Sequence, residues 1–284
     1  MKHILIPTDF SENATNALHY AVQLMKNERC RFYLLNTYTP ISLYTSTIYE
    51  YHTSLNVDLG ELYRKTSEEK LQQSIKEVTE TFSNKLHGFE LISSCNLLTE
   101  QVIECVNTYD IDFIVMGTQG ASGFKEIFLG SQTMHIIKKT TVPVICVPNT
   151  YTYRPIKDIV FATDYELSIA NQGLPLIKNI ATSHGSRVIF LNAYYGVSLD
   201  EYQLDIKEKL DSYFTGNAHQ FHISDGMDVL EAVDDFQSKH NLDLLVMIHN
   251  KHNIFENLLF TPVINKIAHH TKTPFLVIPA IQKK

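Results

Sequence analysis

An internal repeat constrains this chain more than any other feature of its sequence. Three blocks of the first half recur in the second, at offsets of 155, 156 and 131 residues. The drop in offset indicates a shorter segment between the second and third blocks of the second copy. Tandem copies of one domain explain the pattern, and we predict domains at residues 1–150 and 151–284. The matching blocks are Ile4–Asp9 with Ile159–Asp164, Phe32–Tyr38 with Val188–Tyr194, and Ile114–Pro148 with Leu245–Pro279.

Within the first copy, short apolar runs alternate with segments of helical spacing. Ser11 precedes the first helical segment and Thr99 a later one, and both residue types favour N-cap positions. Alternation at this rhythm predicts parallel βαβ units joined by right-handed crossovers, which is an α/β fold. The predicted strands cover residues 3–7, 31–36, 89–94, 113–116 and 143–147, and the predicted helices cover residues 14–25, 59–86, 99–109 and 132–139.

A glycine-rich loop follows the fourth predicted strand, with the spacing Gly117-x2-Gly120-x9-Gly130-Ser131. Glycines allow a backbone to approach a ligand closely, and the helix that begins after Gly130 offers free N–H groups and a positive dipole end. The spacing differs from a P-loop, which needs a lysine after its last glycine. We interpret the loop as a phosphate cradle, and a glycine-rich surface loop without a ligand is the alternative.

This spacing is similar to the nucleotide loop of the universal stress protein (UspA-like) family, G-x2-G-x9-G-[S/T]. The whole chain resembles the tandem, two-domain type of that family. The resemblance implies two Rossmann-like domains, each an open five-stranded parallel sheet of order 3-2-1-4-5 with helices on both faces. It also implies that the fifth strands, at residues 143–147 and 274–278, pair across a two-fold axis. In a tandem chain that pairing forms an internal pseudo-dimer, and a homodimer stays open.

The resemblance further implies an ATP site in the first copy, at which Mg²⁺ or Mn²⁺ bridges the phosphate oxygens. Asp9 corresponds to the acidic residue on the adenine or ribose side, although a turn-forming carboxylate is the alternative for this residue. The implied nucleoside contacts are Pro7, Thr8, Asp9, Asn36 and Thr37; the implied ribose and phosphate contacts are Met116, Gly117, Thr118, Gly120, Gly130, Ser131, Gln132 and Thr133.

The second copy departs from this pattern at every diagnostic position. Ile248 replaces Gly117, and Pro262 replaces Ser131 and removes an N–H that phosphate would need. We therefore predict that the second copy does not bind ATP. The other replacements are Lys251 for Gly120 and Thr261 for Gly130.

We predict that the nucleotide acts as a regulatory ligand rather than a substrate. The cradle lacks a P-loop lysine, and Glu126 is the only carboxylate inside the x9 stretch. Two alternatives stay open: a slow ATPase, and a scaffold that binds no nucleotide. The tyrosine-rich segment Tyr38–Tyr51 is interpreted as a lid or a partner surface, and a loop without such a role is the alternative.

Composition disfavours several other classes of protein. The net charge of −7 is shared by both halves without a basic stripe, so we expect neither nucleic-acid nor membrane binding. Four cysteines, all in the first half and without a CxxC pair, suit a reducing cytoplasm. The chain starts with a strand pattern, so we expect no signal peptide.

Histidines gather in the second copy, and His249-x2-His252 has a spacing that zinc ligands adopt. The second copy has no cysteines to complete a thiolate site, so exposed loop and helix-end histidines are the favoured interpretation. The other members of this group are His219, His222, His269 and His270.

Overall fold

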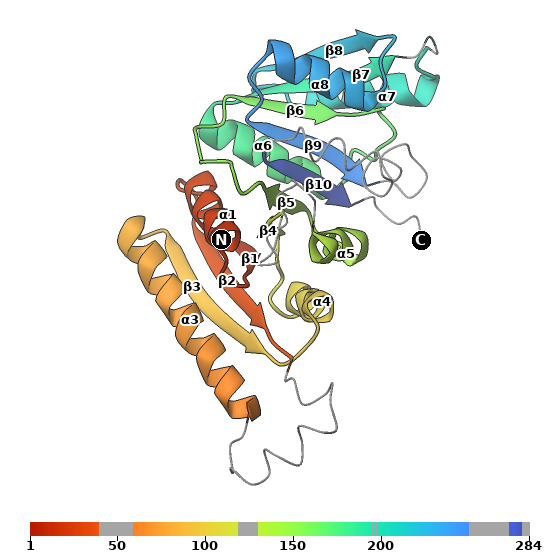
Figure 1. The fold of residues 1–284 in the computed structure, drawn as a ribbon. Helices are drawn as coiled ribbons and strands as arrows, with labels where there is room; N and C mark the ends of the chain where they lie inside the picture. Colours follow the sequence, from red (N-terminus) through yellow and green to blue (C-terminus); the bar gives the residue numbers. More distant parts are fainter. Residues whose placement is uncertain (40–58, 119–129, 195, 197, 250–272, 280–284) are drawn as a thin grey trace.

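The computed structural model of the chain describes residues 1–39, 59–118, 130–194, 196, 198–249 and 273–279. Strands and helices alternate through both halves, as the sequence predicts (Figure 1). Residues 1–150 are called the first half below, and residues 151–284 the second half. The first half contains β1 (Lys2–Pro7), α1 (Glu12–Leu24), β2 (Cys30–Thr37), α3 (Leu59–Thr81), β3 (His87–Ser94), α4 (Leu98–Thr108), β4 (Phe113–Gly117), α5 (Ser131–Lys139) and β5 (Val144–Val147).

The second half repeats this order over its described residues. Its second helix, α7, has 13 residues where the corresponding helix α3 has 23, which accounts for part of the drop in the repeat offset. The elements are β6 (Asp158–Ala162), α6 (Gly173–His184), β7 (Arg187–Tyr194), α7 (Glu201–Tyr213), β8 (His219–Asp225), α8 (Val229–Lys239), β9 (Leu244–His249) and β10 (Phe275–Pro279).

The ten strands of the described residues belong to one sheet, in the order β3-β2-β1-β4-β5-β10-β9-β6-β7-β8. Each half contributes five parallel strands in the order 3-2-1-4-5, which confirms the predicted topology. The halves meet at β5 and β10, which pair antiparallel near the centre of Figure 1. Because β5 already pairs with β4 on one side and β10 on the other, it has no free edge for a second chain.

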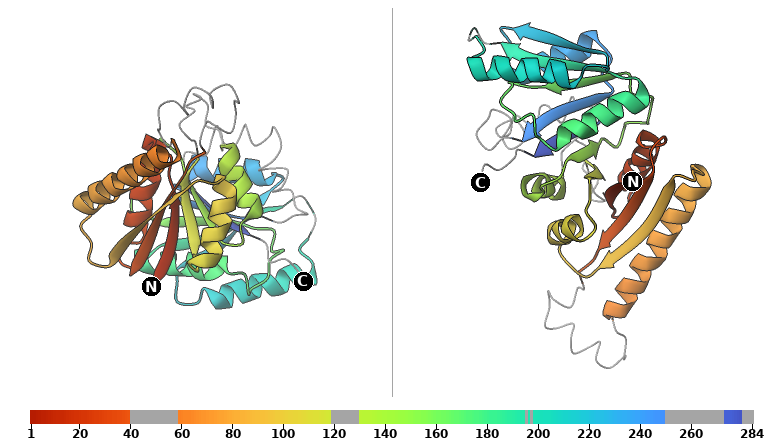
Figure 2. Two further views of the ribbon diagram at one scale, coloured as in Figure 1. Left: turned by 90° about the horizontal axis from the view of Figure 1, so that it is seen from below. Right: turned by 180° about the vertical axis from the view of Figure 1, so that it is seen from behind.

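Helices cover both faces of the sheet (Figure 2). Alternate strand residues point to opposite faces, so Ile4 and Ile6 join one core and Leu5 the other. The first core contains residues of α1, α3, α6 and α7, and the second contains residues of α4, α5 and α8. Each core draws on both halves, so hydrophobic burial holds the two repeats together as well as each repeat by itself.

The two predicted N-caps have different outcomes. Ser11 caps α1, since its side chain accepts a hydrogen bond from Ala14 N at 3.2 Å. Thr99 was predicted to cap the later helix, and this prediction is wrong because α4 begins at Leu98 with Leu97 at the N-cap. Thr99 lies buried in the first turn, and Asn96 Oδ1 accepts from Leu97 N at 2.8 Å just before the helix.

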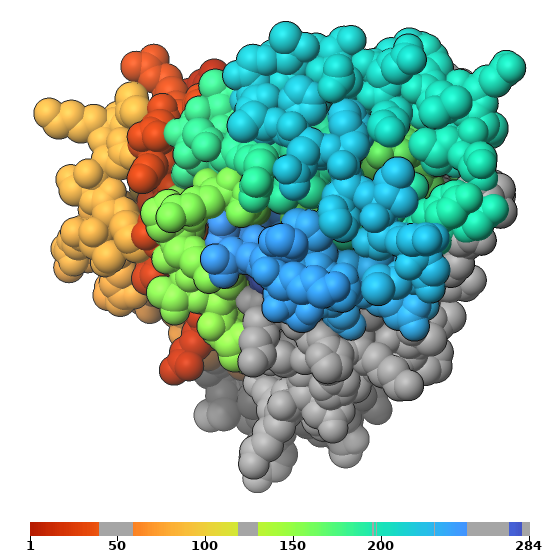
Figure 3. Space-filling model, turned by 90° about the horizontal axis from the view of Figure 1, so that it is seen from above, coloured from red at the N-terminus to blue at the C-terminus, as the bar shows by residue number. Residues whose placement is uncertain are grey.

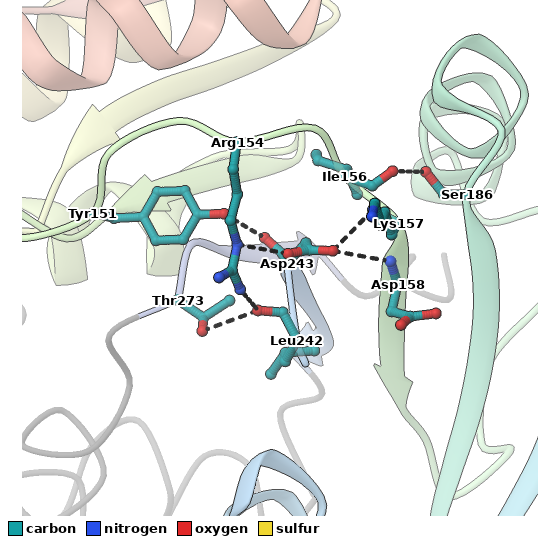
Figure 4. Close-up of polar contacts among 9 residues, drawn as sticks. All are labelled: Tyr151, Arg154, Ile156, Lys157, Asp158, Ser186, Leu242, Asp243 and Thr273. Carbon is teal, nitrogen blue, oxygen red and sulfur yellow. Dashed lines mark hydrogen bonds and ion pairs between the residues drawn. The ribbon is translucent and has the colours of Figure 1, made fainter. Parts of the chain in front are cut away.

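The segment that links the halves is held by Asp243, which immediately precedes β9 (Figure 4). The Asp243 carboxylate is 5% exposed and lies 2.7 Å from Arg154 Nε. Its Oδ2 also accepts from Lys157 N at 2.8 Å and Asp158 N at 3.1 Å. Arg154 donates in turn to Leu242 O at 3.0 Å. One carboxylate therefore ties the linker to the start of a strand in the second half.

Helices α1 and α6 form a second contact between the halves. Glu28, just beyond α1, accepts from Ser183 Oγ at 2.8 Å and from Asn179 Nδ2 at 3.2 Å. His184 Nε2 lies 2.7 Å from Leu24 O at the end of α1. In the space-filling view from above (Figure 3), atoms of the two halves pack directly against each other along this side.

Candidate functional site

The candidate site lies at the carboxyl ends of β1 and β4, which are adjacent strands. Leu5 pairs with Ile114 in the parallel register, and continuing that register places Thr8 beside Gly117. In open parallel sheets, ligands bind outside the carboxyl ends of strands where the strand order reverses. Here β1 is that point, since β2 lies on one side of it and β4 on the other.

A tight turn follows β1 and carries Asp9. Thr8 Oγ1 accepts from Phe10 N at 3.0 Å, and Asp9 Oδ1 accepts from Ser11 N at 3.0 Å. Phe10 has φ of 64°, a left-handed value that a local side-chain hydrogen bond helps to hold. Asp9 thus has the turn-forming role that the sequence left open, and it is also exposed toward solvent.

The same turn recurs after β6, in the half without the glycines. Thr163 Oγ1 accepts from Tyr165 N at 2.9 Å, Asp164 Oδ1 accepts from Glu166 N at 2.9 Å, and Tyr165 has φ of 61°. The Thr-Asp pair is therefore a property of the fold in both halves. By itself it does not mark a ligand site.

The end of β2 lies beside this turn and contributes Asn36 and Thr37. Asn36 is 9% exposed, and its Nδ2 donates to Thr8 O at 2.8 Å. Its Oδ1 accepts from Ser67 Oγ of α3 at 2.8 Å. The Asn36 side chain is thus occupied inside the protein, while Thr37 is half-buried at the end of the strand. Sequence reasoning missed Ser67, because nothing in its local pattern distinguishes it from other helix serines.

The end of β4 is joined to the start of α5 by hydrogen bonds. Gly130 N donates to Thr118 O at 2.6 Å, and Thr133 Oγ1 donates to Gly117 O at 3.2 Å. The buried Thr118 hydroxyl has no hydrogen-bond partner among the described residues. The side chain of Met116 lies in the core below, and Gly120 falls outside the described residues.

The first turn of α5 has no side-chain cap. Gly130 occupies the N-cap with φ of −55°, a value that any residue can adopt. Glycine is therefore not required here for a left-handed backbone conformation, and its relevant property is that it has no side chain. Ser131 and Gln132 are exposed, whereas Thr133 is buried and donates a hydrogen bond to Gly117 O. The turn holds no acidic residue, and Lys138 and Lys139 in the last turn suit the dipole. Such a terminus offers N–H groups to an anion.

Gly117 has a packing role that the sequence did not reveal. A Cβ at this position would lie 2.5 Å from Nδ2 and 2.7 Å from Cγ of Asn13, which projects from α1. Glycine is therefore needed for the buried Asn13 amide to approach β4, whether or not a ligand binds.

In the second half, the start of α7 is bonded to the turn that follows β6. Ile248 of β9, the counterpart of Gly117, is 3% exposed and lies in the core. Gln203 Nε2 of α7 donates to Asp164 O at 2.9 Å, and Tyr202 Oη donates to Leu167 O at 3.1 Å. The start of α7 thus packs on the turn after β6. The other replaced positions, Lys251, Thr261 and Pro262, lie outside the described residues.

Two histidines of the predicted group, His219 and His222, have ordinary partners. His219 lies 3.0 Å from Asp211 and 2.9 Å from Asn217 O, and the ring of His222 packs against Phe236. In the described part of the chain, no three His, Cys, Asp or Glu side chains form a group that could hold a metal ion. His252, His269 and His270 lie outside it, as do Glu126 and most of the tyrosine-rich segment.

The sequence profile of the universal stress protein family matches residues 1–148 and 198–279, which is more than half of the chain. The chain belongs to the universal stress protein family. Its fold is that of the tandem members. Over the described residues, no helix of this universal stress protein is long and apolar enough to cross a bilayer. All four cysteines are free thiols, and Cys95 is the exposed one.

Individual relatives support the same assignment. Universal stress protein MJ0577 of Methanocaldococcus jannaschii is 29% identical over 153 residues, which is 51% of this chain and 94% of that protein. A universal stress protein structure from Archaeoglobus fulgidus aligns with a TM-score of 0.66 at 17% identity, covering 99% of this chain and 97% of that one. A universal stress protein structure from Pseudomonas aeruginosa aligns with a TM-score of 0.63 at 10% identity. These full-length likenesses show that the two-repeat fold is shared.

Proposed function

We propose that the first half binds ATP, with Mg²⁺ or Mn²⁺, as a regulatory ligand at the carboxyl ends of β1 and β4. The observation that carries the proposal is the start of α5, an N-terminus without a side-chain cap or acidic residue that is bonded to the end of β4. Backbone N–H groups at such a terminus attract phosphate. The glycine spacing of the loop that leads into it supports the same ligand.

In this arrangement the phosphates lie against α5 and the nucleoside lies toward β2. Thr118 offers a buried hydroxyl that lacks a protein partner among the described residues, and exposed Ser131 offers another. The first turn of α5 supplies no carboxylate, so the metal ion would be held by phosphate oxygens and water. The nucleoside contacts are then Pro7, Thr8, Asp9, Asn36 and Thr37, and the ribose and phosphate contacts are Met116, Gly117, Thr118, Gly120, Gly130, Ser131, Gln132 and Thr133.

The nucleotide acts as a ligand rather than a substrate in this proposal. Among the described site residues Asp9 is the only carboxylate, and its Oδ1 accepts from Ser11 N within its own turn. Activating water for attack on a phosphate needs a positioned base or water-orienting group. The second half has Ile248 where the phosphate would lie and Gln203 bonded to its turn, so one ATP per chain is expected.

The test is calorimetric titration of MgATP into the wild type and two variants of one exposed residue. Ser131→Glu places a carboxylate at the start of α5, where it suits the helix dipole and yet repels phosphate. Ser131→Gln is the matched neutral control. We expect one site per chain, an affinity loss of at least about thirtyfold in Ser131→Glu, and a change of no more than about threefold in Ser131→Gln.

Two results would contradict the proposal. If the wild type binds no ATP, the glycine spacing serves only the packing seen at Gly117. The alternative of a scaffold that binds no nucleotide would then be favoured. If ATP binds equally to wild type and Ser131→Glu, then the nucleotide site lies elsewhere in the chain.

A further inference from the structure

A buried chain of polar side chains runs from α3 to the turn that carries Asp9. Ser93 Oγ of β3 donates to Ser67 Oγ at 2.8 Å, and Ser67 Oγ donates to Asn36 Oδ1 at 2.8 Å. Asn36 Nδ2 then donates to Thr8 O at 2.8 Å. Ser67 and Asn36 are 5% and 9% exposed. These four residues are called the serine relay below.

The relay occupies a place where apolar side chains would stabilise the fold more. The buried residues of α3 are Ser67, Leu71 and Val78, so a hydroxyl replaces an apolar group in the stripe that faces the sheet. Burying a hydroxyl costs free energy unless it is hydrogen-bonded, and bonding recovers only part of what an apolar contact contributes. A polar group in such a stripe indicates a role beyond packing.

The second half has an asparagine that corresponds to Asn36 but lacks hydroxyl groups at the positions that correspond to Ser67 and Ser93. Asn192 of β7 donates to Thr163 O at 2.9 Å, as Asn36 does to Thr8 O. In the sheet register Asn192 lies opposite Ile223 of β8, whereas Asn36 lies opposite Ser93 of β3. The buried residues of α7 are Ile206 and Leu210, both apolar. The relay is therefore built in the half that has the glycine spacing and not at the matching register position of the other.

We infer that Ser67 is a positioning residue for the nucleoside end of the proposed ATP site, and this inference rests on the proposed function. Its bond holds the Asn36 amide in the orientation that anchors Thr8 O, and Thr8 begins the Asp9 turn. The relay enters from β2 and α3, on the opposite side of β1 from α5. It therefore acts on the base and sugar contacts rather than on the phosphates. Supporting shells of this kind keep contact groups in their binding geometry.

The experiment compares Ser67→Ala with Ser74→Ala, a matched control on the same helix. The Ser74 hydroxyl donates to Lys70 O within α3 and takes no part in the relay. MgATP and MgADP are titrated into each variant and the wild type. We expect Ser67→Ala to weaken ATP and ADP binding by about tenfold each, so that the ATP-to-ADP affinity ratio, which reports on the outer phosphate, stays unchanged. Ser74→Ala should match the wild type.

Ser93→Ala guards against a folding defect at Ser67. Ser93 is half-buried at the outer end of the relay, so this variant should fold and weaken both nucleotides by about threefold. Equal affinities in Ser67→Ala and Ser74→Ala would overturn the inference while leaving the proposed function intact. A changed ATP-to-ADP ratio in Ser67→Ala would also overturn it, because the effect would then reach the phosphate end. Absence of ATP binding by the wild type would remove the proposed function itself.

Discussion

The two halves of this protein share a fold and differ in the side chains that surround the turn after the first strand. Both make the same Thr-Asp turn after the first strand, with Phe10 and Tyr165 in the left-handed conformation. In the first half the turn is anchored from α3 by hydroxyl groups and faces an uncapped helix start. In the second half the turn is covered by the start of α7. The difference shows that a repeat can preserve the hydrogen bonds of a turn while the side chains that surround the turn change.

A second contrast concerns the aspartate before the fourth strand of each half. Asp112 and Asp243 both accept backbone N–H groups at the start of the first strand, from His3 in one case and from Lys157 and Asp158 in the other. The Asp112 side chain is 32% exposed and pairs with Lys2. Asp243 is 5% exposed and also holds the linker (Figure 4). The aspartate at this position therefore bonds only the start of the neighbouring strand region in the first half, and in the second half it also holds the linker.

The largest expected effect sharpens this contrast. We expect Asp243→Ala to lower the free energy of unfolding by about 3 kcal/mol, because this buried carboxylate is the charged acceptor for two backbone N–H groups and for Arg154. Asp112→Ala should cost about 1 kcal/mol, because water reaches the groups it leaves. Urea unfolding followed by circular dichroism measures both. Similar losses for the two variants would show that the linker contact adds nothing.

A smaller loss of stability is expected from substituting two glycines, one in each half, that pack against different side chains. A Cβ on Gly117 of β4 would meet Asn13, and a Cβ on Gly173 of α6 would lie 2.4 Å from Ile278 Cγ2 of β10. We expect Gly117→Ala to cost about 1 kcal/mol and Gly173→Ala about 2 kcal/mol, since the branched Ile278 is fully buried and less able to move.

Double-mutant cycles test whether these costs come from the named contacts. Combining Gly117→Ala with Asn13→Ala, and Gly173→Ala with Ile278→Ala, should recover most of each glycine penalty as a coupling energy, roughly 1 kcal/mol for the first pair and up to roughly 2 kcal/mol for the second. Strictly additive losses would mean that backbone freedom, rather than close approach, explains the glycines.

The smallest expected effect is a change in how stability depends on acid pH, and it concerns histidines that begin the two edge strands. His87 begins β3, and burial lowers its pKa from 6.5, although its bond to Met25 O opposes that shift. Protonation then favours the unfolded chain, so this contribution to stability is complete above pH 6.5 and is lost as pH falls toward the lowered pKa. His219 begins β8, and both its ring nitrogens face acceptors, Asn217 O and Asp211.

Thermal unfolding at pH 7.5 and pH 5.5 separates the two histidines. His87→Gln should reduce the loss of melting temperature on acidification, because it removes a ring that resists protonation. His219→Gln is the matched control at the start of the corresponding strand, β8. An unchanged pH dependence in His87→Gln would assign the acid sensitivity to other groups, among which His19 also has a pKa lowered by burial.

The sequence alone determined the α/β alternation and the tandem repeat, because these depend on local hydrophobic patterns and on blocks that recur. The 3-2-1-4-5 order was implied by the resemblance to the universal stress protein family, and the sheet confirms it. It also identified Ser11 as a cap, since that bond spans three residues. ATP binding and the domain limits at residue 150 stay predictions. Local patterns did not predict the contacts of single residues, because a serine, a glycine or a threonine can occur in the same local pattern with different tertiary partners.

Only the tertiary structure decided which partners meet across long separations. It joined the ten strands into one sheet through β5 and β10 and placed Asn13 against Gly117. It brought Ser67 to Asn36, 31 residues away, and moved the start of α4 ahead of Thr99. The physical reason is that packing and buried hydrogen bonds depend on shape complementarity between distant segments. Residue type and spacing along the chain do not encode that complementarity directly.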